Sequence, residues 1–177
     1  MERELFKKQY QEASEIRDPL FKEKIRQSYE QFDTKIKLVV CIEELAEVLQ
    51  VLSKYYRQKA DRLNLIEELC DSLFCGEILR QHYSISEDEL EKVFQSARRF
   101  VVPAQQLQDS EKESCISLYM KEVSEIVNDF SECFVEEFSE EQMVFVLGSL
   151  LVCIDSLCQF YGITEGELNK AFNVKVK

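Results

Sequence analysis

The chain has 177 residues, with 34 Asp and Glu against 22 Lys and Arg, which gives a formal net charge of −12. That charge repels polyanions, and because the sequence contains no strongly basic patch, we expect no binding to nucleic acid. Hydrophobic residues make up 45% of the chain, including 12 Phe and 7 Tyr, so the composition excludes a disordered acidic tail.

Helical periodicity dominates the beginning of the chain. Asp18 and Pro19 predict an N-cap followed by a proline in the first turn of a helix. Residues 1–32 are therefore expected to form N-terminal helices ahead of the main fold. A further start at Asp33 opens a long stretch of apolar residues at helical spacing, which ends at about Tyr56.

Two more predicted helices complete the first half. The polar segment 57–63 predicts a turn, after which a helix runs to about His82. Ser86, with Glu89 three residues later, forms a capping box, which predicts a helix that runs to about Phe100.

The second half has the same helical character. A linker over 101–109, which contains Pro103 and several Gln, divides the chain into a first module over 1–100 and a second over 110–177. Three capping boxes predict further helix starts: Ser110 with Glu113, Ser139 with Gln142, and Thr164 with Glu167. No strand pattern is visible, so the predicted fold class is all-α.

The second half repeats the first in sequence. A shift of 78 positions places residues 41–94 on 119–172 without a gap, with 15 identities in 54 positions. The agreement is clearest where YSISEDELEKVF, beginning at Tyr83, meets YGITEGELNKAF, beginning at Tyr161. We interpret the repeat as an ancient duplication.

Several kinds of chemistry are excluded by missing motifs. The sequence has no Gly-rich dinucleotide-binding or phosphate-binding loop and no Gly-x-Ser-x-Gly elbow. The single histidine, His82, excludes zinc sites built from several histidines, and we expect it to be an ordinary helix-end residue beside Tyr83.

The cysteines and the apolar runs favour a cytoplasmic protein. Seven cysteines without paired spacings indicate free thiols in a reducing compartment. The N-terminus lacks the apolar core of a signal peptide, and the longest nearly apolar run, residues 143–154, is shorter than the roughly 20 residues that span a bilayer. We therefore expect no membrane partner.

Acidic residues at helical spacing are the most informative feature of the first half. In CIEELAEVLQVLSK, Glu44 and Glu47 lie about 60° apart around the helix axis, and in IEELCDSLFCGEIL, Glu68 and Asp71 have the same spacing. Two such helices packed side by side would offer four carboxylates, an oxygen-rich environment that suits Mg²⁺ or Mn²⁺.

The alternative interpretation is an ordinary solvated helix face. Against it, Val40 and Val51 share the arc of the first acid pair, and helices with apolar residues on both sides tend to be covered on both sides. Carboxylates in such surroundings need a compensating cation. Lys54 falls on the same arc, where its ammonium would meet a phosphate or a neighbouring carboxylate, or would simply be exposed.

The pattern Glu-Glu-x-x-Glu, twenty residues, then Glu-x-x-Asp resembles the signature of the MazG-like all-α nucleoside triphosphate pyrophosphohydrolases. Residues 38–94 look like the core module of that family. The resemblance implies a MazG-like helical bundle. Because family members commonly assemble as dimers, it also implies that the two tandem halves form an internal pseudo-dimer, which could be monomeric or could pair again as a homodimer.

The resemblance also implies roles for individual residues. The implied Mg²⁺ ligands are Glu44, Glu47, Glu68 and Asp71, with Glu43 and Glu67 in supporting positions. Glu47 would also orient or deprotonate the attacking water, and Arg98 and Arg99 would be the candidates for phosphate contacts. Lys54 is the second candidate catalytic residue, on the grounds of its position on the helix rather than of the resemblance. The implied cofactor is Mg²⁺, with Mn²⁺ as a substitute.

The second half departs from this pattern. Glu122 and Glu125 persist, but Val146 stands at the place of Glu68 and Ser149 at that of Asp71. We therefore expect one working metal site and one structural half. Phe145 and Val146 are interpreted as core residues, with a place in the substrate pocket as the alternative.

The reaction implied by the resemblance converts a (d)NTP to the (d)NMP and pyrophosphate, in the removal of non-canonical or surplus nucleotides. The alternative function is a catalytically silent helical module that binds a protein partner or senses a nucleotide. Retention of all four acids in the first half favours the enzyme, since the second half shows that these positions also accept Val and Ser.

Overall fold

The computed structural model describes residues 33–59, 61–97, 101–136 and 138–175, with side chains as far as Ala171. The helices predicted within 1–32 and the two arginines at 98 and 99 lie outside the described residues. Within the described ranges all regular structure is helical and no strand occurs, so the predicted all-α class is confirmed.

The described part of the chain contains six α-helices and one short 3-10 turn. In chain order they are α3 (Thr34–Tyr56), α4 (Arg62–His82), α5 (Glu87–Ala97), η1 (Ala104–Gln106), α6 (Asp109–Val135), α7 (Glu140–Tyr161) and α8 (Glu165–Lys175).

Side-chain caps explain several of the helix starts. The Asp33 carboxylate accepts hydrogen bonds from the backbone N–H groups of Lys35, at 2.6 Å, and Ile36, at 3.2 Å, and so begins α3 where predicted. The capping box predicted at Ser86 is present, because its N–H donates to the Glu89 carboxylate at 2.8 Å. The boxes predicted for α7 and α8 are also confirmed.

The cap predicted for the sixth helix is wrong. Helix α6 begins at Asp109, so Ser110 is already inside it, and the N–H of Gln108 donates to the Glu111 carboxylate at 2.8 Å. The preceding segment is no simple linker, because it forms η1 and packs Ala104 and Leu107 against the core. That packing holds the chain so that Gln108, rather than Ser110, takes the cap position.

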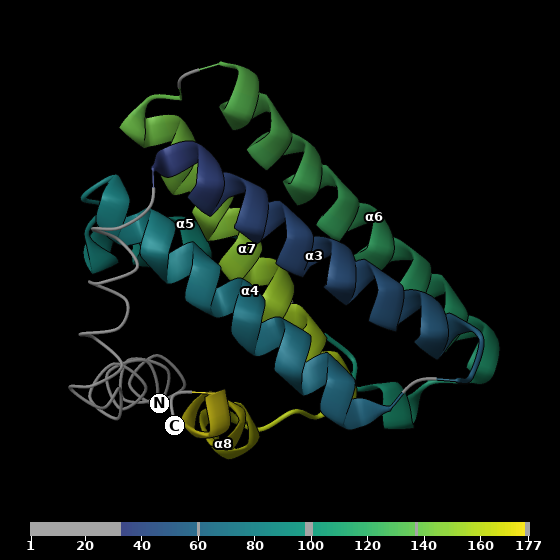
Figure 1. Cartoon of the computed structure of the whole chain (residues 1–177). Coiled ribbons are helices and arrows are strands. Elements are labelled where there is room, and N and C mark those ends of the chain that lie inside the picture. Colours follow the sequence, from purple (N-terminus) through teal and green to yellow (C-terminus); the bar gives the residue numbers. More distant parts are fainter. Residues whose placement is uncertain (1–32, 60, 98–100, 137, 176–177) are drawn as a thin grey trace.

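Four long helices form a bundle and two short helices cover it (Figure 1). Helix α3 packs against α4 and α6, while α7 packs against α6 and α4. Helix α5 lies on α7, and α8 lies on α4. The buried side chains of these helices belong to a single hydrophobic cluster, so the two sequence halves share one core.

The helix order repeats with the same shift of 78 positions as the sequence. Shifted by 78, the bounds of α5 become those of α8, and the start of α4 becomes the start of α7. Shifted in the same way, α3 falls within α6. The packing is reciprocal as well, because each short helix lies on the second long helix of the other half.

Helix α7 is long and apolar enough, by length and composition alone, to cross a membrane. In this fold, however, 67% of its most apolar window is buried against the other helices, which is the situation of a core helix. Its fully buried side chains include Met143, Leu150 and Phe160.

Candidate metal centre

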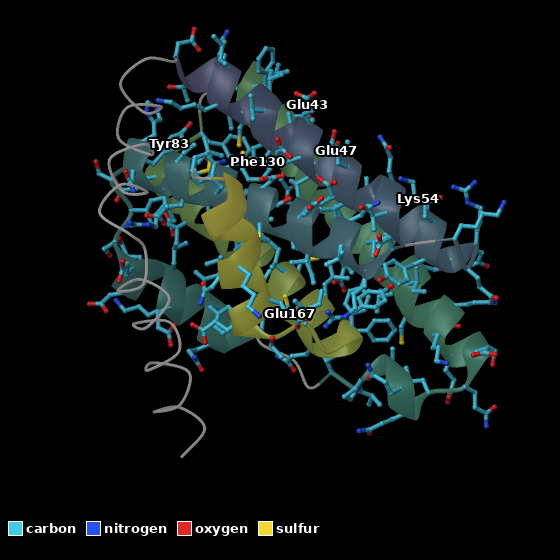
Figure 2. The ribbon with its side chains drawn as sticks, turned by 60° about the horizontal axis from the view of Figure 1, so that its bottom comes forward. Glu43, Glu47, Lys54, Tyr83, Phe130 and Glu167 are labelled. Atoms are coloured by element: carbon cyan, nitrogen blue, oxygen red, sulfur yellow. The ribbon has the colours of Figure 1, made fainter. Side chains whose placement is uncertain are left out.

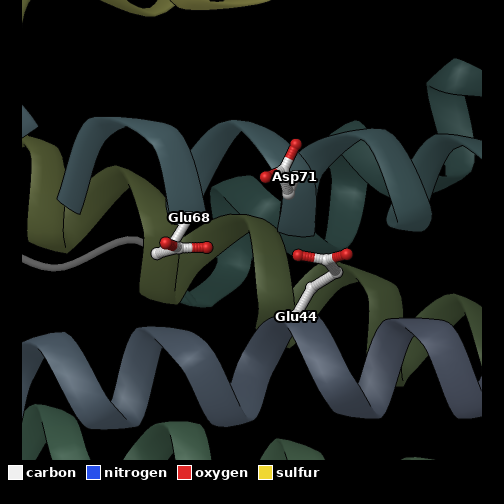
Figure 3. Close-up of side chains that lie close together, drawn as sticks. All are labelled: Glu44, Glu68 and Asp71. Atoms are coloured by element: carbon white, nitrogen blue, oxygen red, sulfur yellow. The ribbon is translucent and has the colours of Figure 1, made fainter. Parts of the chain in front are cut away.

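Three carboxylates converge where α3 and α4 pack side by side (Figure 3). Glu44 comes from α3, and Glu68 and Asp71 come from α4. One carboxylate oxygen of each residue lies within 4.8 Å of the other two. We call these three residues the acidic cluster.

The positions of the three acids follow from the core residues beside them. Leu45 and Leu69 are 2% and 0% exposed, and each directly follows an acid in the sequence. A residue next to a fully buried one lies about 100° around the axis from the core direction, at the border of the helix interface or outside it. Glu47, which precedes the buried Val48, is exposed. The three cluster carboxylates are half-buried, because the packing of α3 against α4 places them at the border.

Two buried thiols adjoin the acidic cluster. Burial, and then the charges of Glu44 and Asp71, raise the pKa of Cys75 to about 12. Burial also raises the pKa of Cys41 well above its usual value, with smaller contributions from Cys75, Glu44 and Cys133. Both thiols therefore stay protonated at neutral pH and form an apolar boundary to the cluster.

The cluster offers the kind of ligand atom that a hard divalent cation takes. Magnesium is held by oxygen ligands at about 2.1 Å, so two ligands on opposite sides of the ion are about 4.2 Å apart. The carboxylate oxygens lie within 4.8 Å of one another, which is slightly wider than that value. Three oxygens without a nearby histidine also match the preference of Mg²⁺ and Mn²⁺ over zinc.

Glu47, the fourth predicted ligand, lies outside the acidic cluster. Its side chain is exposed, as are those of Glu43 and Glu67. Figure 2 shows Glu43, Glu47 and Lys54 following one another along α3. Because Glu47 is rotated by about 60° from Glu44 around the helix axis, it faces solvent where Glu44 faces α4.

The sequence predicted that both sides of this part of α3 would be covered by other parts of the protein, but the side that carries Val40 is partly exposed. Val51 is 3% exposed, but Val40, on the same arc, is 36% exposed. Lys54 is half-buried in the last turn of α3, ten residues and therefore about 15 Å along the axis from Glu44. The structure does not bring Lys54 to the cluster.

The equivalent place in the second half is apolar. Val146 is 3% exposed and belongs to the core, as predicted, whereas Phe145 is 63% exposed and is not a core residue. Glu122 and Ser149 are half-buried, and the exposed Glu125 pairs with Lys121 at 3.0 Å. Among the described residues, the first half alone brings three potential metal ligands together.

His82 is a helix-end residue, as predicted. It is hydrogen-bonded to the Thr34 hydroxyl and meets the ring of Tyr83 edge-on at 5.0 Å. Burial, and then the charge of Lys37, lower its pKa. All seven cysteines are free thiols, in agreement with the sequence prediction.

Two ion pairs near the ends of α4 were not predicted. The Arg80 guanidinium contacts the Glu77 carboxylate at 2.7 Å and donates to the Ile85 carbonyl, so it ties the end of α4 to the turn that follows. At the other end, Arg62 pairs with Glu167, the capping residue of α8. The spacing of Glu77 and Arg80 is a helical i,i+3 signal, whereas no local signal announces the second pair.

No family model, curated protein or solved structure matches this chain.

Proposed function

We propose that this chain is a divalent-cation-dependent nucleoside triphosphate pyrophosphohydrolase of the MazG-like kind. The observation that supports this proposal best is the convergence of Glu44, Glu68 and Asp71 from two helices. The three carboxylates come from two helices, are half-buried and lie within 4.8 Å of one another, whereas a single solvated helix face would leave them exposed. The cofactor would be Mg²⁺ or Mn²⁺, and the substrate a (d)NTP.

Each residue then has a distinct task. When bound, the cation supplies neutralisation of the charge on the triphosphate oxygens. The acidic cluster would hold this cation. Glu47, one turn along α3 on the solvent side, is the carboxylate that accepts a proton from the attacking water. Attack at the α-phosphorus forms one P–O bond and breaks another, and pyrophosphate leaves.

The remaining predicted residues act at longer range. The exposed carboxylates of Glu43 and Glu67 add negative potential that attracts the cation from solution. Lys54 lies further along α3, and we assign its ammonium group to the β- and γ-phosphates of the substrate.

We propose further that the two halves form an internal pseudo-dimer. The repeated helix order and the reciprocal docking of α5 and α8 support it. In this arrangement the first half carries the metal centre, and the second half completes the bundle around it.

A pyrophosphate-release screen over canonical and modified (d)NTPs with Mg²⁺ tests the proposal. Glu44→Gln and Asp71→Asn should each lower the rate at least about 100-fold, because even residues that merely support metal ligands are worth 10–100-fold. Glu122→Gln, the same change at the equivalent position of the second half, is the matched control and should stay near the wild-type rate.

Glu47→Gln separates the two roles suggested for that residue. As a proton acceptor outside the acidic cluster, it should lower the rate while leaving the Mn²⁺-dependent rise in melting temperature intact. Rates that are unchanged in Glu44→Gln and Asp71→Asn would contradict the site. Absence of activity with every nucleotide, together with no response of the melting temperature to Mg²⁺ or Mn²⁺, would favour the silent binding module.

A further inference from the structure

Large apolar side chains are exposed where α3 begins and α6 ends. They are Ile36 (49%), Val39 (46%), Val40 (36%), Phe134 (40%) and Val135 (83%). The Lys35 ammonium lies 5.5 Å from the centre of the Phe134 ring, so the two helix ends are neighbours. We call these five residues the apolar end patch.

The opposite side of α3 is already occupied by the core. Leu38 and Cys41 are 2% and 0% exposed, and they alternate with the patch residues along the same two turns. A helix that is apolar on both sides is usually covered on both sides. Single exposed apolar residues need no explanation, but a group on adjoining helix ends indicates a binding surface.

The patch does not continue along α6. The exposed face of that helix carries Ser114, Ser117 and Ser124, whose hydroxyls donate to backbone carbonyls one turn earlier, and Leu118 is an isolated exposed apolar side chain among them. A stable dimer buries about 1,200–2,000 Å² in total, which five side chains at one end of the bundle do not approach. The patch is therefore suited to a short segment rather than to a second copy of the chain.

The segment that ends next to the patch is residues 1–32. It joins the described fold at Asp33, the cap of α3, and is thus tethered within about 10 Å of Val40. Its last part carries apolar residues at helical spacing: Phe21, Ile25, Tyr29 and Phe32.

Charge also favours this occupant. Residues 1–32 contain seven Lys and Arg and seven Asp and Glu, so the segment is neutral although the whole chain carries −12. It can therefore approach the acidic fold without repulsion between net charges.

We propose that residues 20–32 bind the apolar end patch of the same chain as an amphipathic helix. A helix of that length is about 20 Å long, enough to cover the first two turns of α3 and the end of α6. This proposal is independent of the metal centre, because none of the residues in the acidic cluster takes part.

Photo-crosslinking in the full-length chain tests the contact directly. A photoreactive phenylalanine analogue placed at Val39 should crosslink to residues 20–32, whereas the same group at Leu118, which is similarly exposed at 48% on α6, should not. In an equal mixture of ¹⁴N- and ¹⁵N-labelled protein, the crosslinked peptides should carry one isotope only. Peptides of mixed isotope would assign the patch to a second copy and overturn the proposal, as would absence of crosslinks to 20–32.

Limited trypsin digestion gives a second readout that does not depend on the crosslinker. The double variant Ile36→Glu with Val39→Glu should be cleaved at Lys22, Lys24 and Arg26 about tenfold faster than the wild type, because cleavage follows the population of the undocked segment. Leu118→Glu is the matched control, with thermal melts showing that all variants are folded. Equal cleavage rates in the wild type and the double variant would overturn the proposal.

Discussion

The two halves of this protein have the same order of helices, but the interface between α3 and α4 differs in its side chains from the interface between α6 and α7. Between α3 and α4, Glu44, Glu68 and Asp71 come together half-buried. At the equivalent positions of α6 and α7, Glu122 is retained but Val146 is a core residue. This helical arrangement therefore folds without the acids of its second long helix. The proposed cation site would account for their presence in the first half.

The short helices add a second difference between the halves. Helix α5 lies against Gly148 of α7, where an added Cβ would collide with the side chain of Val93. Helix α8 lies against α4, where the equivalent position is Cys70, whose thiol donates to the Leu168 carbonyl at 3.4 Å. The two docking contacts are thus related in topology but have different side-chain volumes.

Transplanting the acids tests the first difference and should have the largest effect. Val146→Glu with Ser149→Asp buries new carboxylates, which should cost about 3–5 kcal/mol without metal and lower the melting temperature by about 6–20 °C in EDTA. Mn²⁺ should recover much of the loss, and titration should give two bound ions per chain. One bound ion in the folded variant would show that the second half cannot form the site.

The reverse exchange is the control for that experiment. Glu68→Val with Asp71→Ser should abolish Mn²⁺ binding, because it removes two of the three carboxylates of the acidic cluster. The melting temperature in EDTA should stay near the wild-type value, because the second half folds with Val and Ser at the equivalent positions. A large loss of stability would instead mean that the acids are structural.

Gly148→Ala tests the docking of α5. The added methyl should improve helix propensity by up to about 1 kcal/mol, but overpacking against Val93 typically costs about 1–3 kcal/mol, so we expect a net loss. Val93→Ala should restore stability in the double variant. Gly166→Ala, where an added Cβ has nothing within 4 Å, is the control and should not lower the melting temperature. The same result for both glycines would argue against the tight contact.

The pairing of Arg62 with Glu167 should make the second half sensitive to acid. Hydrogen bonds from Arg62 and Thr164 lower the pKa of Glu167 from 4.5 to about 2, so this stabilisation is present above pH 4.5 and is lost as the pH falls towards 2. Urea unfolding at a series of pH values should show a steeper decline for the wild type than for Arg62→Met. Parallel curves would contradict the pair. Glu140, the equivalent of Arg62, carries the wrong charge to form such a pair with Glu89.

Thiol labelling should show the smallest difference between the halves. Burial raises the pKa of Cys75, Cys133 and Cys158 to about 12 in each case, so these thiols should resist iodoacetamide at pH 8 in the folded protein. Cys115 is the one cysteine that is not fully buried and should react first. Its equivalent in the first half is Lys37. Rapid labelling of Cys75, measured by mass spectrometry, would contradict the buried boundary of the acidic cluster.

Much of the fold could be predicted because its signals are local. The cap at Asp33 and the box at Ser86 each act within four residues, so helix starts were visible in the sequence. The start of α6 was not, because Gln108 takes the cap position after Leu107 packs against the core, a contact with distant residues. Arg62 and Glu167 are 105 residues apart, and no local pattern announces their pairing.

The sequence was enough to predict that the candidate site consists of carboxylates from two helices, but not which of those carboxylates come together. Helical spacing placed Glu44 and Glu47 on one arc, and Glu68 and Asp71 on another, because the rotation of about 100° per residue is a local property. Which carboxylate of the first pair faces α4 depends on the angle and depth at which the two helices pack. That packing brings in Glu44 and leaves Glu47 in solvent.

The sequence by itself determined the helical class, the repeat and the two acid-bearing segments, since periodicity and capping operate over a few residues. The tertiary structure decided that Val40 stays exposed, that Phe145 faces solvent and that three acids converge where four were expected. Those outcomes depend on contacts between helices far apart in the chain, whose geometry is set by the summed packing of the shared core rather than by any single segment.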